Sequence, residues 1–263
     1  MFCFIRKILN FIFDLSFRFF SSVGERFLFI FRLFKRNRLG VSRGVMIMEQ
    51  SFEIGVKSIL PVSITGLFTG LVLSAQSYCQ VGSSLPEAVG FFVTKSMLVE
   101  IGPVLTAMVM VGRVGASLAA FLGTMCITEQ VTAMKSMGVD PLQYFVFPRV
   151  IAGMICMPVL SVLSAWIGIL MGYVLCISAF RFTSLTYWSM VIGKIGFTDV
   201  FLLFLKSWIF GLLIISTACF QGLRVGESSS DVGNVTTESV VFSYIGVLVV
   251  NCILTFIFNS IFG

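Results

Sequence analysis

The chain has 263 residues, of which 57% are hydrophobic and only 11% are charged. A typical soluble protein is about one-quarter charged, so this composition excludes an ordinary soluble domain and indicates an integral membrane protein. The sequence contains no histidine and no GxxxxGK[ST] loop, which excludes Ser-His-Asp nucleophiles, HExxH zinc sites and nucleotide hydrolysis within this chain.

The seven cysteines stand singly, with no CxxC pair, so we expect no metal site, no cofactor and no catalytic residue in the chain. The formal net charge is +6, and nine of the 18 Lys and Arg residues lie within the first 43 positions. This concentration of positive charge indicates contact with a membrane surface and argues against a nucleic acid partner.

Residues 1–45 are predicted to form an interfacial amphipathic segment. Charges interrupt this Phe-rich stretch too often for the roughly 20 consecutive apolar residues that a membrane span needs. At about 100° per residue, its charged residues share one helical stripe opposite Phe, Ile and Leu: Lys7, Asp14, Arg18, Glu25, Arg32 and Arg36. Such a helix lies in the headgroup plane. A signal peptide is the competing interpretation, but the stretch lacks an uninterrupted apolar core and a small-residue cleavage site.

Five longer apolar segments predict five transmembrane helices. They lie near residues 58–78, at 91–125, within 149–181, at 200–222 and at 240–262. No Pro-rich linker or convincing internal repeat divides the chain. We therefore predict a single all-α membrane domain over residues 1–263, with the five-helix bundle occupying residues 58–262.

The distribution of basic residues sets the expected orientation of the bundle. Several precede the first span, and basic flanks remain in the cytoplasm: Arg32, Lys35, Arg36, Arg38, Arg43 and Lys57. Five spans then place the N-terminus in the cytoplasm and the C-terminus in the periplasm. The loops that carry Lys135, Arg149 and Arg224 become cytoplasmic, and the connections at 82–90 and 182–199 become external.

Small residues recur at helical spacing in three of the spans. Gly112, Gly115 and Gly123 lie on one face of the second span, and GxxxG pairs occur in the first and the third: Gly66 with Gly70, and Gly168 with Gly172. Such faces allow another helix backbone to approach closely. We expect these glycines to serve ordinary helix packing in a compact bundle that is able to dimerise.

Ionisable residues inside predicted spans are candidates for function, since a charge there is costly and usually faces a partner, a cavity or water. At 1.5 Å per residue, Glu100 and Lys206 should both lie about 9 to 14 Å below the outer surface. A structural ion pair and a polar floor for an amphipathic ligand both remain consistent with this placement. Arg113, nearer the cytoplasmic end, is expected to snorkel or to pair structurally.

Residues 128–141 carry the signals of a short cytoplasmic helix. Thr128 suits the N-cap, Glu129 the first turn and Gly138 the position just after the helix. An apolar strip spaced by three residues runs along it: Val131, Met134 and Met137. The helix could rest on the bilayer or dock into a groove of a soluble partner. The spacing favours neither.

Short motifs follow one another in a fixed order between Glu100 and Val150: E-x-G-P, G-R-x-G, L-G-T-M, T-E-Q, M-G-V-D-P and P-R. In this order and spacing they resemble the signature region of MlaE-type (YrbE-like) permeases. These are the membrane subunits of ABC systems that move phospholipids across the Gram-negative envelope. Weaker similarity extends over nearly the whole chain. The family's architecture agrees with the predicted one: an interfacial helix, five transmembrane helices and a cytoplasmic coupling helix.

The resemblance implies a non-enzymatic permease subunit of the bacterial inner membrane that forms a homodimer and contributes to lipid asymmetry. Its implied partners are an ABC ATPase that binds ATP and Mg, an MCE-domain lipid-binding protein on the outer side, and phospholipid. It also implies roles for particular residues. The expected ATPase contacts are Thr128, Glu129, Gln130, Met134, Met137 and Asp140. The expected residues of the lipid pocket are Glu100, Lys206, Gln76 and Tyr78.

Two other functions remain open from the sequence. An ATP-independent secondary carrier for a hydrophobic or amphipathic solute could use Glu100 and Lys206 for ion coupling, although such carriers commonly show internal repeats. A scaffold that does not transport could share the same helix packing. The direction of transport and the preferred headgroup do not follow from the residues.

Overall fold

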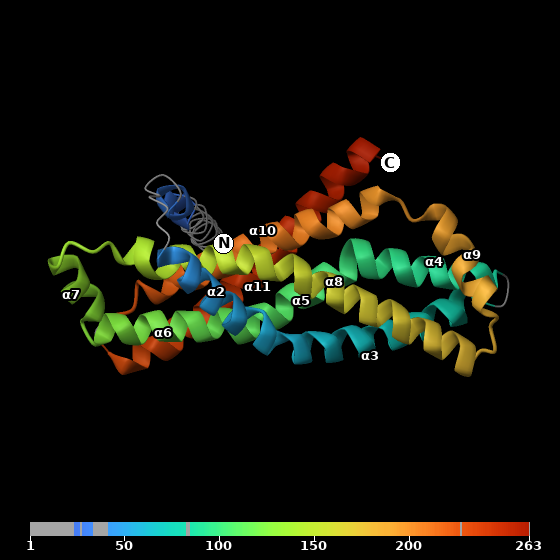
Figure 1. Ribbon diagram of the computed structural model, residues 1–263, viewed down its shortest axis with the longest axis horizontal. Coiled ribbons are helices and arrows are strands. Elements are labelled where there is room, and N and C mark those ends of the chain that lie inside the picture. The colour runs from blue at the N-terminus through green and yellow to red at the C-terminus, as the bar shows by residue number, and fades with distance from the viewer. Residues whose placement is uncertain (1–23, 27, 34–41, 83–84, 227, 263) are drawn as a thin grey trace, which may run out of the picture.

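The computed structural model describes residues 24–26, 28–33, 42–82, 85–226 and 228–262, and this part of the chain forms helices and no strand. Five helical stretches are long and apolar enough to cross a membrane: Gly44–Val81, Pro86–Ile127, Leu142–Ser178, Phe197–Gly222 and Ser229–Ser260. They form an elongated bundle, and the helices run along its long axis (Figure 1). The predicted all-α membrane fold with five spans is confirmed.

The first span begins earlier than predicted. Its elements follow one another without a loop: α2 (Ser42–Ile54), the 3-10 turn η1 (Val56–Ser58), α3 (Ile59–Ser77) and the π-helical turn η2 (Tyr78–Gly82). Glu53 accepts a hydrogen bond from Lys57 at 2.9 Å, and both side chains are exposed. Because these charges pair along the helix surface, they do not interrupt the helix that leads into the membrane.

The second span contains two π-helical turns, and each holds a charged residue. Its elements are α4 (Pro86–Ser96), η3 (Met97–Ile101), α5 (Gly102–Met110), η4 (Val111–Gly115) and α6 (Ala116–Ile127). Glu100 lies in η3 and Arg113 lies in η4. Turns of this type occur frequently at functional sites. Arg113 donates a hydrogen bond to the hydroxyl of Ser58, so it pairs within the protein.

The third span starts with the π-helical turn η5 (Leu142–Val146) and continues as α8 (Phe147–Ser178), so Arg149 lies inside a helix. Its side chain is 7% exposed. Its Nε donates to the side-chain oxygen of Gln50 at 3.1 Å, and its guanidinium lies 4.5 Å from the centroid of the Phe121 ring. The expectation that Arg149 lies in a cytoplasmic loop was wrong, because an amide and an aromatic face replace water around it.

The last two spans are α10 (Phe197–Gly222) and α11 (Ser229–Phe262). In the most apolar window of the third and fourth spans, 56% of the residues are buried, against 11% in the fifth. Helices α8 and α10 therefore form the centre of the bundle. Helix α11 packs on its outside, against α10 and α6.

Two short helices mark opposite ends of the bundle (Figure 1): α7 (Gln130–Ser136) and α9 (Ser184–Lys194). The region of α9 has no long apolar run and was therefore predicted to be a connection between spans. Tyr187 anchors α9 in a buried aromatic cluster, with its ring centroid 5.4 Å from that of Tyr173. Burial raises the pKa of the Tyr187 phenol above its ordinary value.

A close approach of two helix backbones joins α3 to α8. A Cβ on Gly70 would overlap the backbone of Gly168, and a Cβ on Gly66 would lie 2.6 Å from the carbonyl oxygen of Ser164. Three glycines of the second span face side chains instead: Gly112 meets the Tyr244 hydroxyl, Gly115 meets Ile214, and Gly123 meets Val225 and Val232. Close backbone packing therefore occurs at the predicted glycine pair of the first span and not at these three glycines.

Residues 24–26 and 28–33 are helical, and two of their charged residues, Glu25 and Arg26, contact α11 or residues at the end of α10. Glu25 pairs with Arg224 at 2.6 Å, and the Arg26 guanidinium lies 4.1 Å from the centroid of the Phe242 ring. Burial is the largest cause that lowers the pKa of Arg26. Most of the predicted interfacial segment lies outside the described residues, so a helix in the headgroup plane stays a prediction.

Candidate functional site

The structure brings Glu100 and Lys206 into direct contact. Lys206 Nζ donates to Glu100 Oε1 at 2.8 Å. The Lys206 side chain is fully enclosed, whereas 35% of the Glu100 side chain is exposed. The π-helical turn η3 carries Glu100 and the middle of α10 carries Lys206, so the pair joins the second span to the fourth.

The ammonium of Lys206 uses its full hydrogen-bonding capacity. Besides Glu100, it donates to the carbonyl oxygen of Val99 at 2.9 Å and to the hydroxyl of Thr255 at 2.8 Å. A lysine ammonium has three N–H donors, and each is engaged here. Inside a membrane, each N–H donor of an enclosed lysine needs a protein acceptor, because no water is present to accept a hydrogen bond from it.

Two residues of α11 complete the network around Glu100, and neither was among the site residues predicted from the sequence. Thr255 donates to Glu100 Oε1 at 2.7 Å, and the side-chain amide of Asn251 donates to Oε2 at 3.0 Å. These polar residues are spaced by four inside the most apolar span, so they share one helix face. That spacing was the available signal. The network ties three spans together.

A cavity of about 380 Å³ adjoins this network, with both charged and apolar walls. Its lining comes from four helices and the connection before α10: Lys95, Val99, Glu100, Lys194, Gly196, Thr198, Asp199, Leu202, Lys206, Thr255, Phe258 and Asn259. The combination of ionisable and apolar lining fits an amphipathic ligand.

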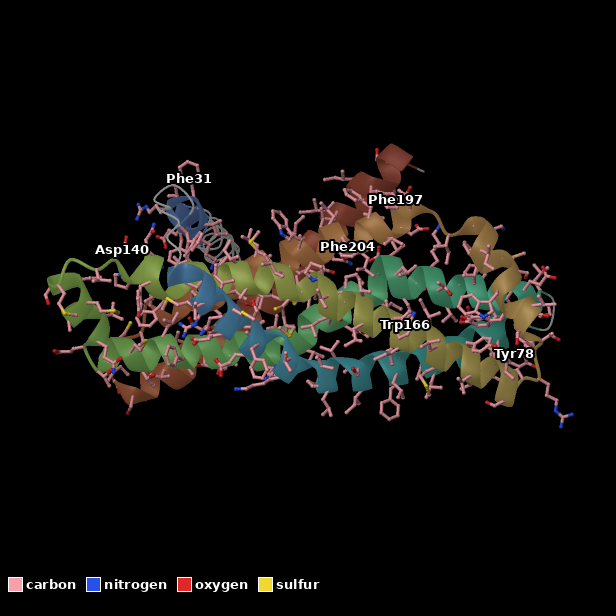
Figure 2. The ribbon with its side chains drawn as sticks, in the orientation of Figure 1. Phe31, Tyr78, Asp140, Trp166, Phe197 and Phe204 are labelled. Atoms are coloured by element: carbon pink, nitrogen blue, oxygen red, sulfur yellow. The ribbon has the colours of Figure 1, made fainter. Side chains whose placement is uncertain are left out.

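Gln76 and Tyr78, the other candidates for a lipid pocket, do not line this cavity in a single chain. Tyr78 stacks on Phe180 with ring centroids 3.7 Å apart. Figure 2 shows Tyr78 at the end of the bundle near α9 and Asp140 at the opposite end near α7. Gln76 is exposed on α3. A role for these two residues in holding lipid stays a prediction.

The short helix α7 exists, but its start differs from the predicted one. Thr128 ends α6, where its hydroxyl donates to the carbonyl oxygen of Thr124 at 2.9 Å, so its assignment as the N-cap of the next helix was wrong. Glu129 precedes α7 in the left-handed region, at φ 56°. Gly138 has φ +76°, as its predicted position just after the helix requires.

The surface of α7 combines an anchored side with an exposed side. Val131 is buried, Met134 is partly buried and Met137 is 70% exposed. Gln130 is exposed as well. Asp140 Oδ1 accepts a hydrogen bond from the Leu142 amide at 3.1 Å, which helps begin the next span. The exposed methionine and amide leave a surface on α7 that a partner can contact.

The chain matches the protein family described as Permease MlaE over residues 47–257. It is 37% identical over 211 residues to a probable ABC transporter permease protein of Rickettsia typhi, covering 80% of this chain and 82% of that protein. It is 35% identical over 212 residues to the intermembrane phospholipid transport system permease protein MlaE of Haemophilus influenzae, covering 80% and 81%. A chloroplastic protein of Arabidopsis thaliana, TRIGALACTOSYLDIACYLGLYCEROL 1, is 27% identical over 214 residues, covering 80% and 61%. The family match includes the Glu100–Lys206 network and α7, and the chain belongs to the MlaE permease family.

Proposed function

We propose that this chain is the membrane subunit of an ABC transporter that moves phospholipids between the inner and outer bacterial membranes. The observation that carries the proposal is the family match over residues 47–257. The Haemophilus influenzae relative, whose name states this activity, supports it. The chain has no P-loop, so a separate ATPase subunit binds ATP and Mg.

The second span offers a mechanical route from the ATPase to the cavity. Helix α7 follows α6 directly, and the same span carries Glu100 in η3. Force on α7 therefore acts on a continuous helix that contains η3 and η4, two turns with irregular hydrogen bonding. A shift at η3 changes the Glu100 network and the shape of the cavity. The cavity must then hold lipid better in one state than in the other, because a ligand shifts an equilibrium only through differential affinity.

The assembly we propose contains two copies of this chain, two ATPase subunits and an MCE-domain lipid-binding protein on the outer side. Helix α7 docks in the ATPase groove through Gln130 and Met137, with Met134 beneath them. The weakly buried helix α11 supplies apolar surface for contact with the second copy or with lipid. The complex lies in the inner membrane, with the N-terminus in the cytoplasm and the C-terminus in the periplasm.

The names of the relatives favour this function over an ATP-independent carrier, since they describe ABC transporter permeases. The saturated ammonium of Lys206 argues in the same direction. An ion-coupled carrier needs a group that exchanges its partner during transport, and each Lys206 donor already has a protein acceptor.

Native mass spectrometry of the tagged chain, gently extracted from its own membrane, tests the proposal. We expect a 2:2 assembly with a P-loop ATPase that retains phospholipid. Recovery without any ATPase, under conditions that preserve other membrane complexes, would contradict it. Depletion of the chain should also slow phospholipid exchange between the membranes, which a scaffold without transport activity would leave unchanged.

A further inference from the structure

Three lysines line the cavity beside Glu100, but they differ in burial and in hydrogen bonding. Lys206 is enclosed and donates its three N–H groups to protein oxygens. Lys95 and Lys194 are exposed. Among the described residues, neither forms an ion pair with a carboxylate. The cavity therefore has one saturated cation in its wall and two ammonium groups free of carboxylate partners.

Lys95 and Lys194 converge on one aromatic ring. Lys95 lies in the last turn of α4 and Lys194 ends α9. Their Nζ atoms lie 5.5 Å and 5.6 Å from the centroid of the Phe91 ring. The ring face attracts each ammonium, but it leaves the repulsion between the two positive charges in place. An anion between them would turn that repulsion into two attractions.

The carboxylates of the cavity have partners of their own. Glu100 accepts from Lys206, Thr255 and Asn251. Asp199 Oδ2 accepts from the Gly196 amide at 3.2 Å, at the start of α10. Positive charge is therefore in excess on the exposed side of the cavity.

Apolar side chains complete the lining. They come from three helices: Val99, Leu202 and Phe258. Lys95 precedes Glu100 by five residues along the second span, so the exposed lysines lie nearer the outer end than the ion pair does. In this arrangement, the lysines at the mouth of the cavity can face a lipid phosphate, and the apolar walls beside them can contact its acyl chains.

We infer that Lys95 and Lys194 form a phosphate-binding subsite at the outer mouth of the cavity and that Lys206 is part of its fixed wall. The inference rests on the proposed function, since lipid transport makes a phospholipid headgroup the occupant. Two flexible lysine arms with three donors each suit the oxygens of a phosphodiester. A free phosphate ion shares this chemistry, and the test separates the two sources.

The test measures binding of two fluorescent probes to the full-length protein in detergent. One probe is acyl-labelled phosphatidylglycerol, and the other is the matching diacylglycerol without phosphate. We expect the wild type to prefer phosphatidylglycerol, and the double variant Lys95→Gln/Lys194→Gln to bind it about tenfold more weakly, as for a lost charge-assisted hydrogen bond. Diacylglycerol binding should not change, and Lys95→Arg/Lys194→Arg should retain the preference.

The single variants Lys95→Gln and Lys194→Gln are measured beside the double variant, and Arg181→Gln is their charge-matched control. Arg181 is exposed, follows α8 at the end of the bundle that carries α9, and does not line the cavity. The Arg181→Gln variant loses one positive charge, as each single Lys→Gln variant does, and should leave the preference for phosphatidylglycerol unchanged. An equal loss in this control would assign the effect to overall charge and overturn the subsite. Thermal unfolding midpoints of the variants should equal that of the wild type, because the replaced side chains are exposed.

Other outcomes separate this inference from the proposed function. Equal affinity of the wild type for the two lipid probes would overturn the headgroup subsite and leave lipid transport standing. Binding of neither probe would contradict the proposed function itself. Lysine-dependent binding of inorganic phosphate, together with equal affinity for the two lipid probes, would overturn the headgroup assignment. The two lysines would then form a binding site for free phosphate ion.

Discussion

Lys206 is accommodated inside the membrane because three oxygens from two other spans surround its side-chain nitrogen. Moving an ammonium out of water costs several kcal/mol, and a single carboxylate repays this only with good geometry and further hydrogen bonds. Val99 and Thr255 supply those bonds at 2.9 Å and 2.8 Å. The network also explains how α11 stays attached to the bundle although it buries so little of its surface.

Lys206→Met should therefore destabilise the protein. It leaves the Glu100 carboxylate and the Thr255 hydroxyl without a shared donor. Breaking a fully buried pair costs about 3–5 kcal/mol, and we expect less here because 35% of the Glu100 side chain is exposed and water can reach it. The midpoint of thermal unfolding in detergent measures the effect. Adding Glu100→Gln should restore much of the lost stability, because the glutamine is neutral, its amide oxygen can accept from Asn251, and its amide nitrogen can donate to the Thr255 hydroxyl that has lost its Lys206 donor.

The double variant Glu100→Gln/Lys206→Met also separates the two roles that the sequence left open. If the pair is a structural tie, the double variant should keep the preference for a phosphate-bearing lipid. Loss of that preference in a stable double variant would show that the pair itself holds the headgroup. If the loss of stability in the double variant equals the sum of the losses in the two single variants, the two residues are not coupled.

At the residue scale, the sequence could predict which charges matter but not what surrounds them. Glu100 and Lys206 stood out because each interrupts an apolar span. Their contact depends on how three helices pack, and the polar residues of α11 gave a weaker signal since neutral polar residues in membrane helices also serve ordinary helix–helix hydrogen bonds. Arg149 was placed in a loop because its charge was taken as the end of a span. The structure instead surrounds it with Gln50 and Phe121.

At the element scale, the contact between α3 and α8 depends on glycine at defined positions. Gly70→Ala places a Cβ against the Gly168 backbone, and we expect overpacking to cost about 1–3 kcal/mol and to lower the thermal unfolding midpoint. Gly112→Ala is the matched control from the predicted set, since its Cβ would meet only the Tyr244 hydroxyl, at 3.5 Å. Alanine has the higher helix propensity, so propensity alone would stabilise both variants. A similar loss in both variants would contradict a specific role for the contact between Gly70 and α8.

Helix α7 offers a test of partner docking that leaves the bundle intact. Met137 is 70% exposed, so Met137→Asp should fold normally and place a charge where an apolar contact is expected. We expect ATPase recovered with the purified chain to fall by about tenfold or more, which corresponds to about 1.4 kcal/mol of binding free energy. Undiminished recovery would show that α7 does not dock through this methionine.

Ser230→Asp is the control for that experiment. Ser230 is exposed in the first turn of α11, where a negative charge is favourable. It should leave ATPase recovery unchanged. If α7 rests on the bilayer instead, Met137→Asp should weaken its protection from a soluble protease and spare the ATPase.

The elements themselves were largely predictable, and their ends were not. Runs of apolar residues locate all five spans because a bilayer demands length and hydrophobicity together. The same criterion placed the start of the first span too late, just after Glu53 and Lys57. These two charged side chains form an ion pair with each other, so the helix continues through them. Helix α9 escaped the criterion altogether. It is short, and aromatic contacts around Tyr187 hold it in place rather than an apolar run.

At the scale of the whole molecule, α7 and α9 lie on opposite sides of the membrane, because a single span, the third, separates them. The structure fixes their separation along the bundle (Figure 1), and the basic residues before the first span predict which end is cytoplasmic. Chemical labelling of exposed thiols from one side of the membrane can test this orientation. Cys79 is exposed in η2, at the end of the bundle near α9, and Ser136 is exposed at the end of α7.

A membrane-impermeant maleimide should therefore label Cys79 in intact cells with a permeable outer membrane, and Cys79→Ser should remove that label. Cys252, although exposed from the bundle, lies within the fifth span, where the bilayer keeps out a water-soluble reagent. In the Cys79→Ser background, a thiol introduced by Ser136→Cys should react only after the inner membrane is opened. Labelling of that thiol in sealed cells would invert the proposed topology. It would place α7 in the periplasm, beyond the reach of any cytoplasmic ATPase, and the coupling route through the second span would fail with it.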